Sequence, residues 1–421
     1  MSGSGDESNP DAAARRAVER AARESYGRLV AFLAARTRDV AGAEDALADA
    51  FAAALQQWPE NGVPDNPDAW LLTVARRRST DALRRRATGL AHARDVRLIA
   101  EELDAASALS DDIPDRRLAL MFACAHPAIE PGIRTPLILQ TILGLTAAEI
   151  ASAFLVPPAT MGQRLVRAKA RLKDAGIAFD VPESRELPER LDAVLAAVYA
   201  AYTKGWSDTD DAAASQLADE AIWLGRVIVA LMPDEPEAKG VLALMLHTEA
   251  RRAARRDADG AYVPLEEQDI RLWNLAMIDQ AEALLSAASA SGPSGRCQIE
   301  AAIQSAHAAR RLAGAATWPA IVALYDILGE IAPSPVVALN RAVALGERDG
   351  PAAALAALDL AGTDPRLAGY QPYWAARAHL CARASRSAEA AEAFTLAIGL
   401  TTDPAVRRYL QRRQAQVAGA A

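Results

Sequence analysis

Basic side chains at helical spacing are the clearest chemical signal in this chain, and they lie between Thr146 and Lys173. Thr146 with Glu149 three residues later is the pattern of a helix N-terminus, and Val156-Pro157-Pro158 interrupts that helix. A second helix then begins near Ala159. A short helix, a turn and a basic helix form a helix-turn-helix, in which the second helix enters the major groove of DNA. The spacing therefore predicts a DNA-reading helix.

The predicted recognition helix carries side chains suited to bases and to phosphates. Glutamine pairs with adenine and arginine with guanine or phosphate, so the first half of this helix is expected to reach base edges. The basic residues further along are expected to contact backbone phosphates. The candidate residues are Thr160, Gln163, Arg164, Arg167, Lys169 and Arg171. The alternative is a basic helix with only a structural role.

A second basic helix is predicted over residues 67–86, upstream of the first. Its two arginine triplets are spaced so that members align on one face at i, i+4 and i+8, where they could neutralise several phosphates. Trp70 suits either stacking on an unpaired base or packing in a core. The candidate residues are Trp70, Arg76, Arg77, Arg78, Arg84, Arg85 and Arg86. The alternative for the arginines is a solvated basic face.

The elements that must position these side chains are predicted to be helices throughout, which makes the fold class all-α. The 421 residues are rich in alanine and leucine, with 5% aromatic residues, a composition that favours helices. Apolar stripes at helical spacing run through residues 15–57, and a turn-rich break is predicted at Trp58-Pro59 and over 61–67. Residues 1–14 are predicted to be disordered.

Charge distribution assigns the DNA contact to the first part of the chain. The net charge is −8. Most of this excess lies beyond residue 180, where the chain would repel a phosphate backbone. Residues 1–180 are nearly neutral but concentrate their arginines in clusters. We therefore expect nucleic acid to bind residues 1–180.

Several functional classes receive no support from the sequence. The three cysteines, Cys124, Cys297 and Cys381, are widely spaced, which fits a reducing compartment. No targeting signal is recognised, and no apolar run approaches the ~18 residues that span a bilayer. Cys124-Ala125-His126 lacks a second pair of ligands, and no catalytic or phosphate-binding motif is found. We expect a cytoplasmic protein without enzymatic activity, metal, cofactor or membrane contact.

The region beyond residue 180 shows a weak internal repeat. Positions that alternate large and small side chains recur after a shift of about 36 residues, as in TPR-type helix pairs. The first set is Ala338, Ala342, Leu345, Ala354, Leu358 and Ala361, and the second is Trp374, Ala378, Cys381, Ala390, Phe394 and Ala397. A TPR-like array is predicted, with a generic helical bundle as the alternative.

With both basic helices in place, the chain resembles bacterial RNA polymerase sigma factors of the extracytoplasmic-function class, within the sigma-70 family. Residues 44–51 resemble the region 2 helix that docks on the polymerase clamp, and residues 67–86 resemble the segment that opens and reads the −10 element. Residues 146–172 resemble region 4, the reader of the −35 element. Residues 320–325 and 335–343 look like the TPR-like C-terminal extension of one subgroup.

This resemblance implies partners, modules and roles. The partners are the RNA polymerase core, through its clamp and flap, and promoter DNA. Asp45, Asp49 and Phe51 would bind the polymerase core. The modules would be region 2 at 15–87, a linker at 88–115, region 4 at 116–178 and the extension at 179–421. The extension would regulate or complete polymerase engagement, through a protein partner or an intramolecular contact.

A different class of DNA-binding protein stays open as the alternative. A stand-alone transcription regulator would combine the helix-turn-helix with a TPR-like sensor domain. That interpretation accounts for residues 116–421 but gives no role to the first 90 or so residues. The two classes differ in DNA binding, because a stand-alone regulator binds duplex DNA without the polymerase.

Overall fold

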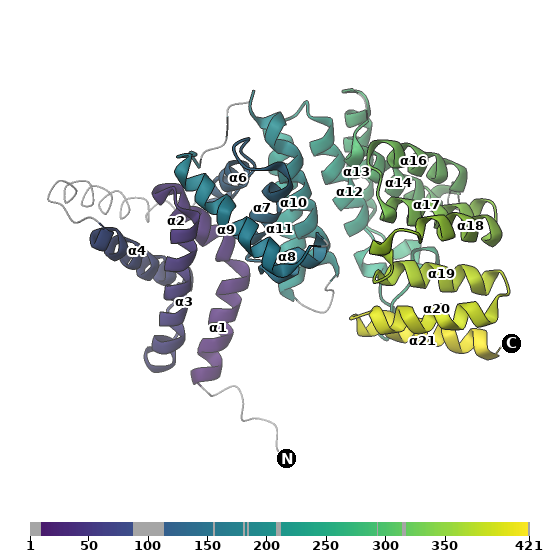
Figure 1. The fold of residues 1–421 in the computed structure, drawn as a ribbon, viewed down its shortest axis with the longest axis horizontal. Helices are drawn as coiled ribbons and strands as arrows, with labels where there is room; N and C mark the ends of the chain where they lie inside the picture. Colours follow the sequence, from purple (N-terminus) through teal and green to yellow (C-terminus); the bar gives the residue numbers. More distant parts are fainter. Residues whose placement is uncertain are drawn as a thin grey trace, which may run out of the picture. The chain divides into compact units, whose positions relative to one another are not determined.

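The structure is a computed structural model that describes residues 10–86, 113–154, 156–179, 182, 185–207, 212–292, 294–313 and 317–419. Within these ranges every regular element is a helix, which confirms the predicted all-α class (Figure 1). None of the described helices has the length and apolarity that crossing a bilayer requires. The chain divides into two compact units, Met1–Leu224 and Gly225–Ala421.

Four helices begin the first unit: α1 (Pro10–Glu24), α2 (Tyr26–Thr37), α3 (Val40–Asn61) and α4 (Pro67–Arg86). The prediction of disorder up to residue 14 is wrong for residues 10–14, because Ala14 and the next apolar positions of α1 are buried. The predicted break at Trp58-Pro59 is also wrong. Helix α3 continues to Asn61, since Pro59 lies in its last turn, where the Gly62 N–H still reaches the Trp58 carbonyl.

Side chains at the ends of these helices fix where they begin. The Asp39 carboxylate accepts a hydrogen bond from the Gly42 N–H at 3.0 Å and caps α3. Asn66 does the same for α4, with its side-chain oxygen 3.1 Å from the Ala69 nitrogen. These caps fix the starts of the two helices that carry the predicted polymerase-binding and −10 residues.

Six further helices follow, the last of which crosses into the second unit: α6 (Ile113–Cys124), α7 (Pro131–Leu143), α8 (Ala147–Ala153), α9 (Pro158–Asp174), α10 (Leu187–Ser207) and α11 (Ala212–Leu231). Helix α6 begins inside the predicted linker, the rest of which, at 88–112, lies outside the described residues. Helix α2 packs on α6 and α7, and α10 packs on α7 and α6.

A close backbone approach joins the two halves of this unit. A Cβ atom at Gly27 of α2 would lie 1.9 Å from the Ile142 carbonyl oxygen of α7. Only glycine fits such a distance. The helices before and after the predicted linker therefore share one core.

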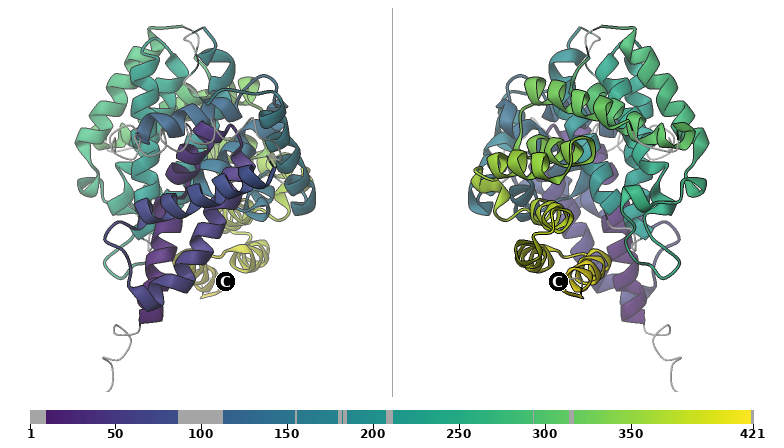
Figure 2. Two further views of the ribbon diagram at one scale, coloured as in Figure 1. Left: turned by 90° about the vertical axis from the view of Figure 1, so that its left-hand side faces the viewer. Right: turned by 90° about the vertical axis from the view of Figure 1, so that its right-hand side faces the viewer.

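The second unit is a succession of helices. They are α12 (Pro236–Glu249), α13 (Leu275–Ser289), α14 (Arg296–Ala308), α15 (Arg310–Ala313), α16 (Trp318–Ile331), α17 (Pro335–Arg348), α18 (Pro351–Ala361), α19 (Gln371–Arg383), α20 (Ser387–Leu400) and α21 (Pro404–Gly419). Short 3-10 turns occupy 252–254, 265–267, 270–272 and 365–367. Figure 2 shows the last helices, in yellow, lying side by side and nearly end-on to the viewer.

Two consecutive helix pairs follow the predicted repeat. Helices α19 and α20 begin 36 residues after α17 and α18. Nine of the predicted packing positions are buried: Ala342, Leu345, Ala354, Leu358, Ala378, Cys381, Ala390, Phe394 and Ala397. Trp374 and Ala361 are half-buried, and Ala338 is exposed. The pairing of helices is present, whereas membership of the TPR class stays a prediction.

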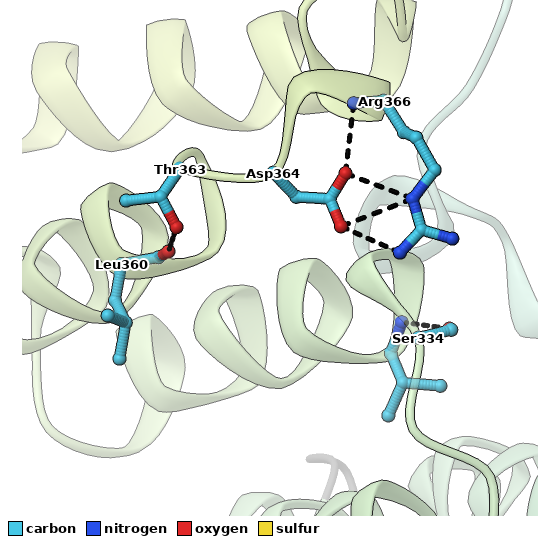
Figure 3. Close-up of polar contacts among 6 residues, drawn as sticks. Ser334, Leu360, Thr363, Asp364 and Arg366 are labelled. Carbon is cyan, nitrogen blue, oxygen red and sulfur yellow. Dashed lines mark hydrogen bonds and ion pairs between the residues drawn. The ribbon is translucent and has the colours of Figure 1, made fainter.

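Local hydrogen bonds set the boundaries of these pairs. Ser334 caps α17 by accepting from the Val337 N–H at 3.1 Å. After α18 ends, the Thr363 hydroxyl donates to the Leu360 carbonyl at 2.8 Å. Asp364 then accepts from both the backbone and the guanidinium of Arg366 (Figure 3). Short polar contacts thus turn the chain between α18 and α19.

Candidate nucleic-acid interface

A reciprocal pair of hydrogen bonds starts α8, the helix before the predicted reader. The Thr146 N–H donates to the Glu149 carboxylate at 2.8 Å, and the Glu149 N–H donates to the Thr146 hydroxyl at 3.2 Å. This capping box confirms the predicted N-terminus. The backbone hydrogen bond from Thr146 and the ammonium of Lys204 lower the pKa of Glu149 to about 2. The cap is therefore charged at neutral pH.

Helix α9 has one side in the core and the other in solvent. The buried side chains recur every three or four residues: Met161, Leu165, Ala168 and Leu172. Four of the six predicted DNA-binding residues lie on the exposed side: Thr160, Gln163, Arg167 and Arg171. An amide and two guanidinium groups are thus available to one ligand.

The other two predicted residues of α9 are held by carboxylates of the same unit. Arg164 lies 3.2 Å from Glu130, next to α7. Lys169 lies 2.5 Å from Glu44 of α3, and its side chain is 11% exposed. Burial raises the pKa of Glu44, and the Lys169 ammonium acts against this rise.

A second ion pair joins the same two helices. The Lys173 ammonium lies 2.5 Å from the Asp39 carboxylate at the start of α3. Three basic groups of α9, Arg164, Lys169 and Lys173, are therefore already paired with carboxylates of the same unit. Fewer basic side chains of α9 are therefore available to bind DNA than its sequence indicates.

The arginine triplets of the upstream helix are only partly described. The Arg76 guanidinium lies 4.8 Å from the centre of the Phe32 ring, so it points into the unit. Arg77 and Arg78 are exposed. The side chains of Arg84, Arg85 and Arg86, at the end of α4, lie outside the described residues. The first triplet therefore offers two arginines to solvent and keeps the third inside.

Trp70 and the predicted polymerase-binding residues occupy different environments. The Trp70 ring is half-buried, edge-on to Trp58 at 5.4 Å between ring centres. Asp45 and Asp49 are exposed on α3, whereas Phe51 is half-buried. The two carboxylates are free of the core, while both aromatic side chains contribute to packing.

Sequence reasoning missed two features of α9. Val166 is 69% exposed between Gln163 and Arg167, although an apolar side chain of an amphipathic helix is normally expected to face the core. Glu44 faces α9, although it belongs to the predicted docking helix. The exposure of Val166 follows from its position about 100° around the helix from Leu165, away from the buried side. No pattern in the sequence predicts the ion pair between Lys169 and Glu44, because the two residues lie 125 positions apart.

A pocket of about 190 Å³ lies in the second unit. It is lined by Leu265, Glu266, His307, Arg310, Trp318 and Glu347. Burial lowers the pKa of His307 to about 4, so this imidazole is neutral at pH 7. Its ring lies edge-on to Trp318 at 5.5 Å. In the described part of the chain, no three metal-ligating side chains cluster.

Comparisons with known proteins match two segments of this chain. Residues 22–88 match the family model of sigma-70 region 2, and the structure forms this segment from α2, α3 and α4. Residues 190–289 match a family of unknown function, DUF6596. An uncharacterized protein of Rhizobium meliloti (strain 1021), R00370, is 40% identical over 381 residues, which cover 88% of each chain. No solved structure matches this chain.

Proposed function

This chain belongs to the sigma-70 family of transcription initiation factors, and we propose that it is an alternative sigma factor of the extracytoplasmic-function type. It directs the polymerase core to promoters by reading the −10 element with α4 and the −35 element with α9. The observation that carries this proposal is the exposed side of α9, with Gln163, Arg167 and Arg171, in one unit with sigma-70 region 2.

The region 2 residues divide between polymerase and DNA. Asp45 and Asp49 are exposed one helical turn apart on α3, which suits contact with basic side chains of the polymerase clamp. Phe51 supports this surface from within. Arg77 and Arg78 on α4 neutralise phosphates while the duplex opens. Trp70, packed against Trp58, positions α4 rather than stacking on a base.

The region 4 residues read the duplex. Gln163 pairs with an adenine and Arg167 with a guanine or a phosphate. Thr160 and Arg171 contact the backbone on either side and set the register of α9. Arg164 and Lys169 contact DNA only after their ion pairs with Glu130 and Glu44 break. This scheme needs no catalytic residue, because binding energy alone opens and positions the DNA.

The extension completes or regulates this machinery. Helix α10 packs on α7 and α6, and the Lys204 ammonium lies 3.0 Å from the Glu149 carboxylate of α8. Helix α10, which follows the proposed region 4, thus contacts α6, α7 and α8, the helices that precede α9. Residues 225–421 then act on promoter output through a protein partner or the rest of the chain.

Transcription in vitro tests the main proposal. Purified core polymerase would be supplied with genomic fragments, with and without this chain. We expect discrete new start sites that share −10 and −35 sequences. The double variant Gln163→Ala/Arg167→Ala should lose these starts, whereas Gln56→Ala, exposed on α3, serves as the matched control. Absence of any new start with active polymerase would contradict the proposal.

A chain truncated after Leu231 tests the role of the extension. It keeps the first compact unit, including α10, together with the whole of α11. We expect its output from the mapped promoters to differ from that of the full chain. Equal output from the two chains would show that residues 232–421 have no part in initiation.

A stand-alone regulator remains the second candidate, because the pocket beside His307 and Trp318 offers the extension a place for a small ligand. Such a regulator would bind promoter duplex tightly without polymerase. A gel-shift titration with and without core polymerase separates the two. Under the main proposal, tight binding requires the polymerase.

A further inference from the structure

An apolar hollow lies on the solvent side of α9. It is lined by Ala159, Gly162, Gln163, Val166 and Arg167, and it is shallow and open to solvent, with a volume of about 440 Å³. Val166 is 69% exposed, although valine is a poor helix former on a water-facing surface. Its small neighbours on this side are Ala159 and Gly162, so the surface beside Val166 is recessed and almost entirely apolar.

Gly162 gives independent evidence that this surface approaches another molecule. A Cβ atom at Gly162 would meet only the Ala147 Cβ, at 3.9 Å, which is an ordinary contact. Alanine would therefore fit and would stabilise the helix. At Gly27, by contrast, packing does require glycine. A glycine that packing does not need, within a helix, suits close approach of a ligand.

The charges around the hollow favour nucleic acid as the occupant. Arg167 borders it, Arg171 lies one turn further along the same side, and both are exposed. Gln163, which also borders it, has the donor and acceptor that adenine requires. An apolar surface with one arginine at its edge complements the one apolar group that a major groove presents, the 5-methyl group of thymine.

We propose that the hollow between Ala159, Gly162 and Val166 receives a thymine methyl group of the −35 element, beside the adenine that Gln163 reads. This inference rests on the proposed function and adds a specificity-determining contact to it. The −35 element therefore contains an A·T step at a fixed position under the first half of α9. Burying one methyl group accounts for about a fourfold preference over a pair that lacks it.

Deoxyuridine substitution tests the contact, because it removes only the methyl group. In the promoter mapped by transcription, each thymine of the −35 element would be replaced singly on either strand. We expect one replacement to reduce output at limiting protein about fourfold, with thymines of the spacer as controls. A −35 element without thymine, or no effect at any position, would overturn the proposal.

The Val166→Ala variant ties the effect to this side chain. Val166 is exposed and alanine is the better helix former, so the variant folds. We expect the variant to give about fourfold less transcript than the parent chain on the promoter with thymine. Deoxyuridine replacement should not reduce its output further, so the two changes are non-additive in a double-mutant cycle. If Val166 instead docked on a protein, the variant would lose equally on both templates, which would also overturn the proposal.

The Gly162→Ala variant separates binding from folding. The midpoint of thermal unfolding should stay the same or rise, while promoter output falls because the added methyl group fills the hollow. Equal output from this variant and the parent chain would contradict the proposal. If the parent chain produces no start site at all, the proposed function fails instead, so the two failures are distinguishable.

Discussion

Thr146 and Glu149 fix the start of α8, the first helix of the predicted DNA-reading motif. Each accepts a hydrogen bond from the other's backbone, so two amide groups that the helix cannot satisfy find partners. This pair could be predicted because its spacing is local. Its salt bridge with Lys204 could not, because that partner lies on α10.

Removal of this cap should destabilise the first unit. We expect Thr146→Ala to lower the free energy of unfolding by about 1 kcal/mol, the usual worth of an N-cap side chain. Urea denaturation followed by circular dichroism measures this difference. Thr73→Ala is the control, since the Thr73 hydroxyl is exposed and bonds only to its own helix. Equal losses from the two variants would contradict this role of the cap.

The charge of Glu149 adds a pH dependence. Its pKa is lowered to about 2 in the folded chain, from an ordinary value of 4.5. The carboxylate therefore stabilises the fold fully above pH 4.5, and this contribution is lost as the pH falls toward 2. The stability difference between the parent chain and Glu149→Gln should shrink over that interval. A difference that stays constant from pH 6 to pH 3 would contradict the assignment.

Gly27 has a structural role opposite to that of Gly162. Because its Cβ would collide with the Ile142 carbonyl, Gly27→Ala must push α2 away from α7. We expect a loss of stability of about 1–3 kcal/mol, typical of overpacking. Thermal unfolding of Gly27→Ala and Gly162→Ala, side by side, checks this contrast. A similar response from both variants would refute it.

At the scale of elements, periodicity predicted the helices and repeat offset well. The buried spacing of α9 and the 36-residue offset of α17–α18 and α19–α20 both follow from local patterns. The predicted break at Pro59 comes two residues too early, because the missing N–H of proline removes one hydrogen bond without ending α3, which continues to Asn61. Arg164 and Lys169 look equivalent to Arg167 in sequence, and only tertiary ion pairs distinguish them.

This distinction has a measurable consequence for promoter reading. Gln163→Ala should lower transcription by about 5- to 150-fold, the worth of one bidentate base contact at about 1–3 kcal/mol. Arg164→Ala should cost far less, since its guanidinium is already bound to Glu130. Initiation rates on one mapped promoter compare the two variants. A larger loss from Arg164→Ala would mean that this ion pair opens on DNA.

At the scale of the whole chain, the contact between α9 and α3 sets a geometric condition. In the proposed function, α4 reads the −10 element and α9 the −35 element, and their names place these elements about 25 base pairs apart, which is about 85 Å of B-DNA at about 3.4 Å per pair. Lys169 and Lys173 hold α9 against Glu44 and Asp39 of α3. Reading both elements at once therefore requires these helices to separate.

Fluorescence transfer between the two helices measures that separation. Dyes would be attached at Ala41→Cys on α3 and Asp174→Cys on α9, both exposed positions. The native cysteines interfere little, because Cys124 and Cys381 are buried and the pKa of Cys297 is raised by burial. We expect high transfer in the free chain and low transfer in the polymerase–promoter complex. High transfer in both would contradict simultaneous reading.

The packing of α10 also limits where two related chains could be recombined without loss of folding. The DUF6596 match begins at residue 190, inside α10, yet this helix belongs to the compact unit that ends at Leu224. A chimaera joined at residue 190 would cut α10 and expose the apolar surfaces of α6 and α7. We therefore expect an exchange of C-terminal segments between relatives to preserve folding only when α10 stays with the helices of the first unit.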